Sequence, residues 1–167
     1  MAASGVANSE TFKVTTPSDT VIQLTRLFDA PRHLVFEAMS KPEHIKRWWG
    51  NLGEGYSVPI CEVDLRVGGK WRFVNRHPQG DAEFYGVYKE ITAPERVVFT
   101  EIYAPFPDAE SVVTTVLTEE NGKTRLTASS SYPSKEVRDI VLSTGMERGA
   151  ALSYDRLDEI AMGLASR

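Results

Sequence analysis

Apolar and β-branched residues occur in short runs along most of the chain, and clusters of glycine, proline, asparagine and aspartate separate these runs. Runs of this composition, closed by turn residues, are typical of strands in an antiparallel sheet. The runs that we expect to form strands are 20–28, 57–67, 70–76, 82–91, 96–103, 111–118 and 124–132. The pattern therefore predicts an antiparallel sheet of about seven strands.

Helical spacing occurs after the first of these runs and again near the end of the chain. Asp29 and the stretch from Ser40 to Glu43 have the composition of N-terminal caps for two short helices, the second ending at Gly50. Ser134 has the same property for a helix that would extend to about Met162. Apolar residues recur there at three- and four-residue steps, at Met146, Ala150, Tyr154, Leu157, Ile160, Ala161 and Leu164. This spacing predicts one long C-terminal helix.

The order of elements predicts an α+β fold of the helix-grip type, in which a curved antiparallel sheet wraps around the C-terminal helix. The middle of that helix is rich in small residues, namely Gly145, Gly149, Ala150 and Ala151. Small side chains that face a concave sheet leave space, so we expect a cavity between sheet and helix. We expect residues 1–18 to form a flexible N-terminal tail, with the alternative that Phe12 and Val14 begin strand pairing, and residues 19–167 to form a single domain.

Composition argues against several classes of partner. The chain has 167 residues, of which 41% are hydrophobic, and a formal net charge of -4 with no basic stripe for nucleic acid. We find no apolar segment long enough for integral membrane association and no signal peptide, so we expect a cytoplasmic protein. Cys61 is the one cysteine and is expected to be a buried small side chain. The three histidines lack metal-ligand spacing, so we expect no metal and no cofactor.

The predicted cavity has a set of candidate lining residues. Trp71 and Phe73 are two residues apart and therefore share one face of a strand. The residues that we expect to contact a small ligand are Trp49, Trp71, Phe73, Phe84, Phe99, Glu101, Tyr103, Met146, Ala150 and Tyr154. Packing of the hydrophobic core would also explain the aromatic residues among them, and one indole of Trp48-Trp49 could serve packing alone.

Glu101 is the candidate acid or base in this set. It shares a strand face with Phe99 and Tyr103. If this face lies toward the cavity, loss of hydration would raise the carboxyl pKa and suit Glu101 to proton transfer. If the face with Val98 and Ile102 lies inward instead, Glu101 is a solvated strand residue.

The remaining polar candidates have simpler interpretations. Asp64 and Arg66 have the spacing of a surface ion pair beside a turn. His33 and His44 fall in helical segments and are expected to face solvent. His77 precedes Pro78 in a turn, which we place at the mouth of the cavity as a weaker candidate for a functional role.

Short motifs extend over nearly the whole chain, from about Val21 to Leu164. They are Phe28-Asp29-Ala30-Pro31, Val35-Phe36-Glu37-Ala38, Pro42-Glu43-His44 through Trp48-Trp49-Gly50, Asp64-x-Arg66-x-Gly68-Gly69-x-Trp71, Gly86 before Tyr88-Lys89-Glu90-Ile91, Pro94-Glu95-Arg96-Val97-Val98-Phe99-Thr100, Thr124-Arg125-Leu126-Thr127, Gly145-Met146-Glu147-x-Gly149 and Tyr154-Asp155-Arg156-Leu157. As a set they resemble the AHSA1-like branch (activator of Hsp90 ATPase homologue) of the START/Bet v 1 (SRPBCC) helix-grip superfamily. The resemblance implies a cavity under the C-terminal helix. Many relatives carry tryptophan where this chain has Ala150, which implies a larger cavity here.

The resemblance does not imply one reaction, since relatives include lipid carriers, polyketide cyclases and a co-chaperone. We expect the protein to bind a small hydrophobic or amphipathic ligand in the cavity. One alternative is a cyclase or hydrolase that uses Glu101 and a tyrosine for proton transfer. Another is an Hsp90-type co-chaperone with a chaperone partner, and the sequence also leaves a homodimer open.

Overall fold

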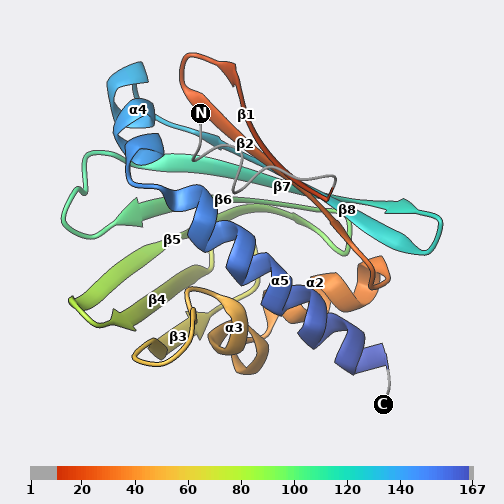
Figure 1. Cartoon of the computed structure of the whole chain (residues 1–167). Helices are drawn as coiled ribbons and strands as arrows, with labels where there is room; N and C mark the ends of the chain where they lie inside the picture. Colours follow the sequence, from red (N-terminus) through yellow and green to blue (C-terminus); the bar gives the residue numbers. More distant parts are fainter. Residues whose placement is uncertain (1–10, 166–167) are drawn as a thin grey trace.

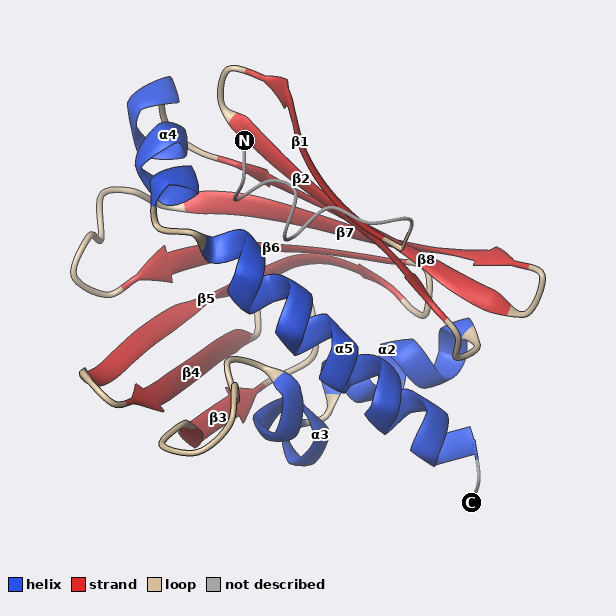
Figure 2. Cartoon of the chain, in the orientation of Figure 1, coloured by secondary structure: helices blue, strands red, loops and turns tan. Residues whose placement is uncertain are grey.

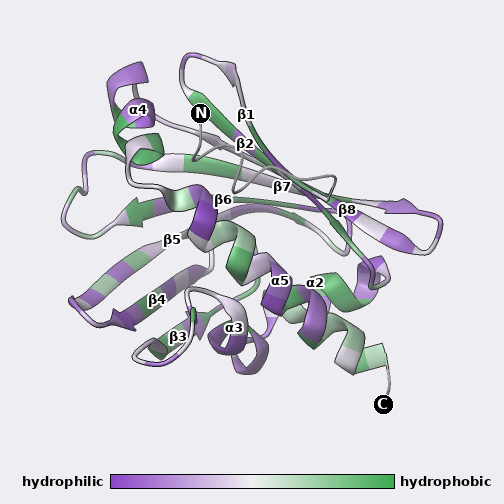
Figure 3. Ribbon diagram, in the orientation of Figure 1, coloured by the Kyte–Doolittle hydropathy of each residue, from purple (hydrophilic) through white to green (hydrophobic). Residues whose placement is uncertain are grey.

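The computed structural model describes residues 11–165, which form one strongly curved antiparallel sheet with helices on its concave face (Figures 1 and 2). The strands are β1 (Phe12–Ser18), β2 (Val21–Phe28), β3 (Ser57–Val63), β4 (Lys70–His77), β5 (Gly80–Thr92), β6 (Arg96–Tyr103), β7 (Ser111–Glu120) and β8 (Lys123–Ser131). Their order across the sheet is β1-β2-β8-β7-β6-β5-β4-β3, so β3 to β8 form a meander and β2 closes against β8. Figure 3 shows hydrophobic and hydrophilic residues alternating along β4 and β5, as a sheet with one covered face requires.

Four helices accompany the sheet. They are α2 (Arg32–Ser40), α3 (Pro42–Trp48), α4 (Lys135–Ser143) and α5 (Met146–Ala165). In Figure 2, α5 crosses the sheet diagonally, while α2 and α3 lie beside the second half of α5. The α+β class and the helix-grip arrangement are thus confirmed.

The C-terminal helical region differs from the single helix predicted. Ser134 caps α4, because its Oγ accepts a hydrogen bond of 3.2 Å from the Val137 N–H. The helix ends at Ser143, and Gly145 has a φ of +73°, which the right-handed helix does not allow. A new helix, α5, therefore starts at Met146, and the small residue at position 145 is a helix break.

The two caps predicted before the short helices are wrong. Pro31 and Lys41 occupy the cap positions of α2 and α3, without a side-chain hydrogen bond. The backbone N–H of Asp29 instead donates to both Asp158 carboxylate oxygens, at 3.1 and 3.2 Å. The Ser40 hydroxyl donates to the carbonyl of Phe36, one turn back in α2. Asp29 and Ser40 do not cap these helices, because the N-cap positions, which have extended backbone angles, are Pro31 and Lys41.

The sheet has one strand more than the seven expected, because residues 12–18 pair with β2. They belong to the segment that we expected to be a flexible tail, whose residues 1–10 lie outside the described part. Phe12 is 3% exposed, so burial of its ring accounts for the ordered pairing. At the other side of the sheet, the strand expected over 57–67 ends at Val63.

The outer strands of the sheet are β1 and β3, and each contains a proline. Pro17 lies where the pairing of β1 with β2 shifts register, between Thr15 and Ser18. Pro59 lies at the equivalent shift between Ser57 and Ile60 in β3. Proline lacks an N–H donor, which confines it to such edge positions in a sheet.

Ion pairs from the buried Arg26 side chain fix α5 to the sheet, one to the buried Asp158 and one to the exposed Asp155. Arg26 on β2 lies 2.5 Å from Asp155 and 3.4 Å from Asp158, both on α5. Asp158 also accepts from the Asp29 backbone, so it ties β2 and the following turn to one helix face. These contacts, with the buried side chains of Phe28 and Leu157, position α5 over the concave face.

Candidate functional site

A cavity of about 560 Å³ lies between the concave face of the sheet, the helices α2 and α3, and the first half of α5. Nine of the ten predicted ligand contacts line it, namely Trp49, Trp71, Phe73, Phe84, Phe99, Glu101, Met146, Ala150 and Tyr154. Their side chains come from loops, strands and α5, which the curvature of the sheet brings together. The cavity predicted from small residues on the C-terminal helix is therefore present next to Ala150.

Tyr103 is the one predicted contact that does not line the cavity. It is the last residue of β6 and is 39% exposed. Its ring stacks on that of Phe84, with centroids 5.0 Å apart and an interplanar angle of 27°. Phe106 lies 5.9 Å beyond it, so a row of aromatic rings leads from the cavity wall to the surface. Strand alternation places Tyr103 on the same face of β6 as Phe99 and Glu101. It does not line the cavity because the end of β6 extends beyond it.

One wall of the cavity is a contact network of aromatic rings. The Trp49 ring contacts those of Phe73 and Phe84, with centroid separations of 5.0 and 5.3 Å. The Trp71 ring lies 4.9 Å from Phe73 and 5.6 Å from Phe99. These tilted and edge-to-face contacts are the arrangements that aromatic pairs prefer, so the wall is apolar and preorganised.

The adjacent tryptophans play different parts. Trp48 is 7% exposed, and its Nε1–H donates 2.9 Å to the carbonyl of Ala38, joining α3 to α2. Trp49 follows the end of α3 and turns toward the aromatic wall. Packing therefore dominates for the first indole, and the second is available to a ligand.

The indole of Trp71 is fixed by a hydrogen bond beside Gly86, where the pairing of β5 with β6 is interrupted. Its Nε1–H donates 3.1 Å to the carbonyl of Thr100 on β6. The N–H of Val87 bonds to the Thr100 hydroxyl, at 3.0 Å, instead of to a backbone carbonyl. A Cβ at Gly86 would lie 1.8 Å from the Thr100 oxygen and 2.7 Å from Trp71 Nε1. Position 86 therefore requires glycine, because the Thr100 backbone and the Trp71 indole leave no room for a Cβ.

Glu101 faces the cavity together with Val97 and Phe99. Among residues 11–165, no hydrogen bond or ion pair reaches its carboxylate; its backbone carbonyl accepts from the Ser111 hydroxyl. Burial away from water raises the carboxyl pKa from 4.5 to about 7. Of the two faces considered for β6, the one with Phe99 and Glu101 is the inner one.

Two tyrosines lie near enough to sense the charge of Glu101. Burial raises the pKa of Tyr132 to about 12, and the negative charge of Glu101 adds to the shift. Burial and the same charge raise the pKa of Tyr154 above its ordinary value. Both hydroxyls therefore stay protonated at neutral pH and can donate hydrogen bonds inside the cavity.

Replacing Glu101 with glutamine should stabilise the protein at alkaline pH. The pKa in the folded state lies above the unfolded value, so the favourable contribution is fully present below about pH 4.5 and is lost as pH rises through about 7. We expect E101Q to be more stable than wild type by roughly 2–3 kcal/mol at pH 8 and nearly equal to it at pH 4. Urea unfolding at both pH values measures this, and an equal difference at the two values would contradict it.

The other polar candidates lie away from the cavity. Asp64 and Arg66 form an exposed ion pair of 2.8 Å, as expected for a surface pair. His33 is exposed, but His44, expected to face solvent, is 8% exposed, with Nε2 3.6 Å from Glu37. It was misassigned because α3 packs against α2 and α5 on that side. His77 contacts Gln79 within its own turn and does not line the cavity.

In the part of the chain that the structure describes, Cys61 and the side chains that could ligate a metal form no further candidate site. Cys61, expected to be buried, is half-buried, and this burial raises the pKa of its thiol to about 11, so the thiol remains protonated at neutral pH. Within residues 11–165, no three His, Cys, Asp or Glu side chains gather closely enough to hold a metal ion. Over the same range, none of the helices has the length and apolarity needed to cross a membrane.

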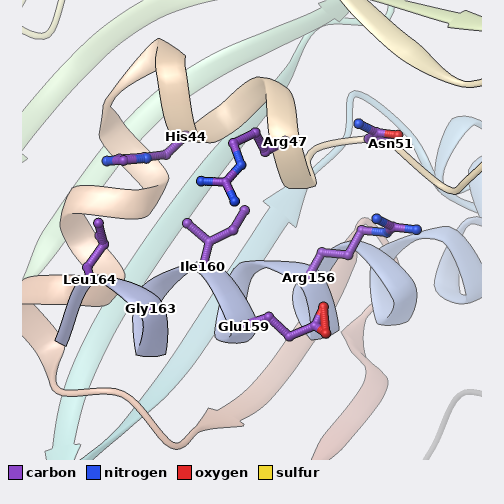
Figure 4. Close-up of a pocket in the computed structure, with 8 residues that line it drawn as sticks. All are labelled: His44, Arg47, Asn51, Arg156, Glu159, Ile160, Gly163 and Leu164. Carbon is purple, nitrogen blue, oxygen red and sulfur yellow. The ribbon is translucent and has the colours of Figure 1, made fainter. Parts of the chain in front are cut away.

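Sequence reasoning missed part of the lining and a second cleft. Phe36 and Met39 on α2 also line the cavity, and neither was among the ligand contacts expected from the sequence. The second cleft, of about 600 Å³, lies between α3 and α5 (Figure 4). Its lining consists of His44, Arg47, Asn51, Arg156, Glu159, Ile160, Gly163 and Leu164. No sequence signal joins residues from helices so far apart in the chain.

A curved sheet that grips one helix over an aromatic cavity defines a helix-grip protein. The chain belongs to the family described as Activator of Hsp90 ATPase homolog 1-like protein, which it matches over residues 29–162. This confirms the AHSA1-like resemblance carried by the motifs. Among curated proteins, none matches the chain.

Solved structures from several bacteria share the fold. A crystal structure from Rhodobacter sphaeroides has a TM-score of 0.82 and 25% identity, and the match covers 92% of this chain and 99% of that chain. A Nitrosomonas europaea protein has a TM-score of 0.79 and 22% identity, over 91% of this chain and 100% of that one. A Mycobacterium smegmatis protein has a TM-score of 0.79 and 24% identity, over 89% and 94% respectively. These similarities extend over nearly the full length of each neighbour.

Proposed function

We propose that the protein binds a small hydrophobic or amphipathic molecule in the cavity between the sheet and α5. The observation that carries the proposal is the cavity of about 560 Å³, walled by aromatic rings and containing few polar groups. Binding sites for small molecules have this volume and this lining. Membership of the AHSA1-like family is compatible with this proposal, because the shared fold encloses the cavity between the sheet and α5.

The direct test is saturable uptake of a neutral apolar dye, N-phenyl-1-naphthylamine, followed by competition with a panel of lipids, flavonoids and polyketides. The expected result is enhanced dye fluorescence at one site per chain and displacement by at least one class of competitor. Because Trp49 and Trp71 line the cavity, their fluorescence should change in the same titration. Dye uptake that does not saturate, with unchanged tryptophan emission, would contradict the proposal.

A second candidate function is proton-transfer catalysis in the same cavity, of the cyclase or hydrolase kind. The observation that favours it is the raised pKa of Glu101, close to neutrality and near the hydroxyl of Tyr154. This function requires turnover whose pH dependence disappears in E101Q. The Hsp90-type co-chaperone reading rests on family membership alone and would be tested by stimulation of Hsp90 ATPase activity.

A further inference from the structure

The cavity lining contains two charged side chains, of which one is ion-paired and the other is not. Among the described residues that line the cavity, these are Arg96 and Glu101, both on β6. Arg96 forms an ion pair with Glu90 on the neighbouring strand. The two lining residues are five positions apart, which corresponds to about 16 Å along a strand. One end of the cavity therefore has a neutralised cation, and the other has a carboxyl group without a partner.

The groups around Glu101 supply hydrogen bonds but no positive charge. The strands β5 and β7 and the helix α5 contribute aromatic, aliphatic and hydroxyl side chains to the lining, and none of these is charged. The titratable groups among them are Tyr88 and Tyr154, joined by Tyr132 at the end of β8. Tyr132 and Tyr154 line the same cavity as Glu101, and its negative charge contributes to the rise of the pKa of both.

A carboxylate in an apolar cavity is costly to leave unpaired, and a bound cation or hydrogen-bond donor removes that cost. A bound anion would instead be repelled by it at short range. We propose that Glu101 selects the polar end of the ligand, so that the cavity prefers amphipathic amines and discriminates against amphipathic carboxylates. This inference rests on the proposed binding function and adds to it the chemical class of ligand.

The preference depends on pH in a defined direction. Glu101 is mostly protonated at pH 6 and mostly ionised at pH 8, because its pKa lies at about 7. A protonated amine therefore binds more tightly as pH rises over this range, whereas a carboxylate binds less tightly. An alcohol of the same chain length carries no charge and should change little.

The test is displacement of N-phenyl-1-naphthylamine by decylamine, 1-decanol and decanoate, each below its aggregation concentration, at pH 6 and pH 8. At pH 8 we expect decylamine to bind at least about tenfold more tightly than decanoate, because hydrogen bonds to charged groups contribute energies of this size. The amine should gain about tenfold in affinity from pH 6 to pH 8. E101Q should lose both the amine preference and this pH dependence while still binding decanol.

A matched control is Glu62→Gln, which removes an exposed carboxylate from β3, outside the cavity lining. This variant should keep the wild-type amine preference. Equal affinities for amine and carboxylate in the wild type, or an amine preference retained in E101Q, would overturn the inference while dye and decanol binding upheld the proposed function. Failure of the dye and all three competitors to bind would instead overturn the proposed function itself.

Discussion

Replacing Ala150 with tryptophan is expected to weaken binding of apolar ligands by roughly 100-fold or more while the fold is retained. Ala150 lines the cavity from α5, and an indole at this position would project into the space that a ligand needs. Tryptophan is tolerated in a helix at a cost of less than about 0.7 kcal/mol, so α5 should form normally. Dye titration measures the loss of affinity, and far-ultraviolet circular dichroism checks the fold.

Leu152→Trp is the matched control for this prediction. Leu152 lies two residues away on α5, is 49% exposed and does not line the cavity. It adds the same side chain to the same helix, so its ligand affinity should equal that of the wild type. Unchanged dye affinity in A150W would mean that the ligand binds elsewhere, for instance in the cleft between α3 and α5.

Replacing Gly86 with alanine is expected to destabilise the protein by more than about 4 kcal/mol. The new methyl group would lie 1.8 Å from the Thr100 carbonyl oxygen, which belongs to the backbone of the adjacent strand. Neither partner can move away without breaking the pairing of β5 with β6 or the hydrogen bond from Trp71. Costs of this size arise when a well-packed interior has no room for added atoms. Urea unfolding followed by tryptophan fluorescence measures the change.

Gly163→Ala provides the comparison. Gly163 lies inside α5, and no atom beyond its own helix neighbours lies within 4 Å of a Cβ placed there. Alanine is the better helix former by about 1 kcal/mol, so this variant should be slightly more stable than the wild type. If G86A proved as stable as the wild type, β5 and β6 would have to be farther apart at Thr100 than the structure shows.

Most of the sheet could be predicted from the sequence because its strands have clear turn residues between them. The strand β1 was considered only as an alternative, because its two apolar residues, Phe12 and Val14, are followed by Thr15–Ser18, which has no apolar alternation. Its order comes from pairing with β2, which no local pattern encodes. Glycines inside a helical pattern indicate a bend or a close approach, but they do not by themselves predict the division into α4 and α5. The helical spacing of apolar residues continues through Gly145. The two helices are distinguished by the positive φ of this residue, which the sequence pattern does not reveal.

The cavity lining could be predicted where strand alternation and helix spacing decide which way a side chain points. Trp71, Phe73 and Ala150 are examples. The direction of Glu101 could not be decided, because both faces of its strand carry apolar residues and either could lie inward. Tyr103 shows the limit of alternation, since a residue on the correct face still lies outside when its strand extends past the cavity. Whether Phe36 and Met39 of α2 line the cavity depends on how that helix packs against the sheet, and the spacing of apolar residues does not specify this packing.

The prolines in the two outer strands also bear on self-association. An exposed strand edge offers unpaired backbone groups that can recruit a strand from another molecule and start fibre growth. Pro17 and Pro59 each lack an N–H donor and lie where the local register shifts, which disfavours continuous extension of the sheet by a second chain. Copies of this protein should therefore resist amyloid-like stacking at these edges.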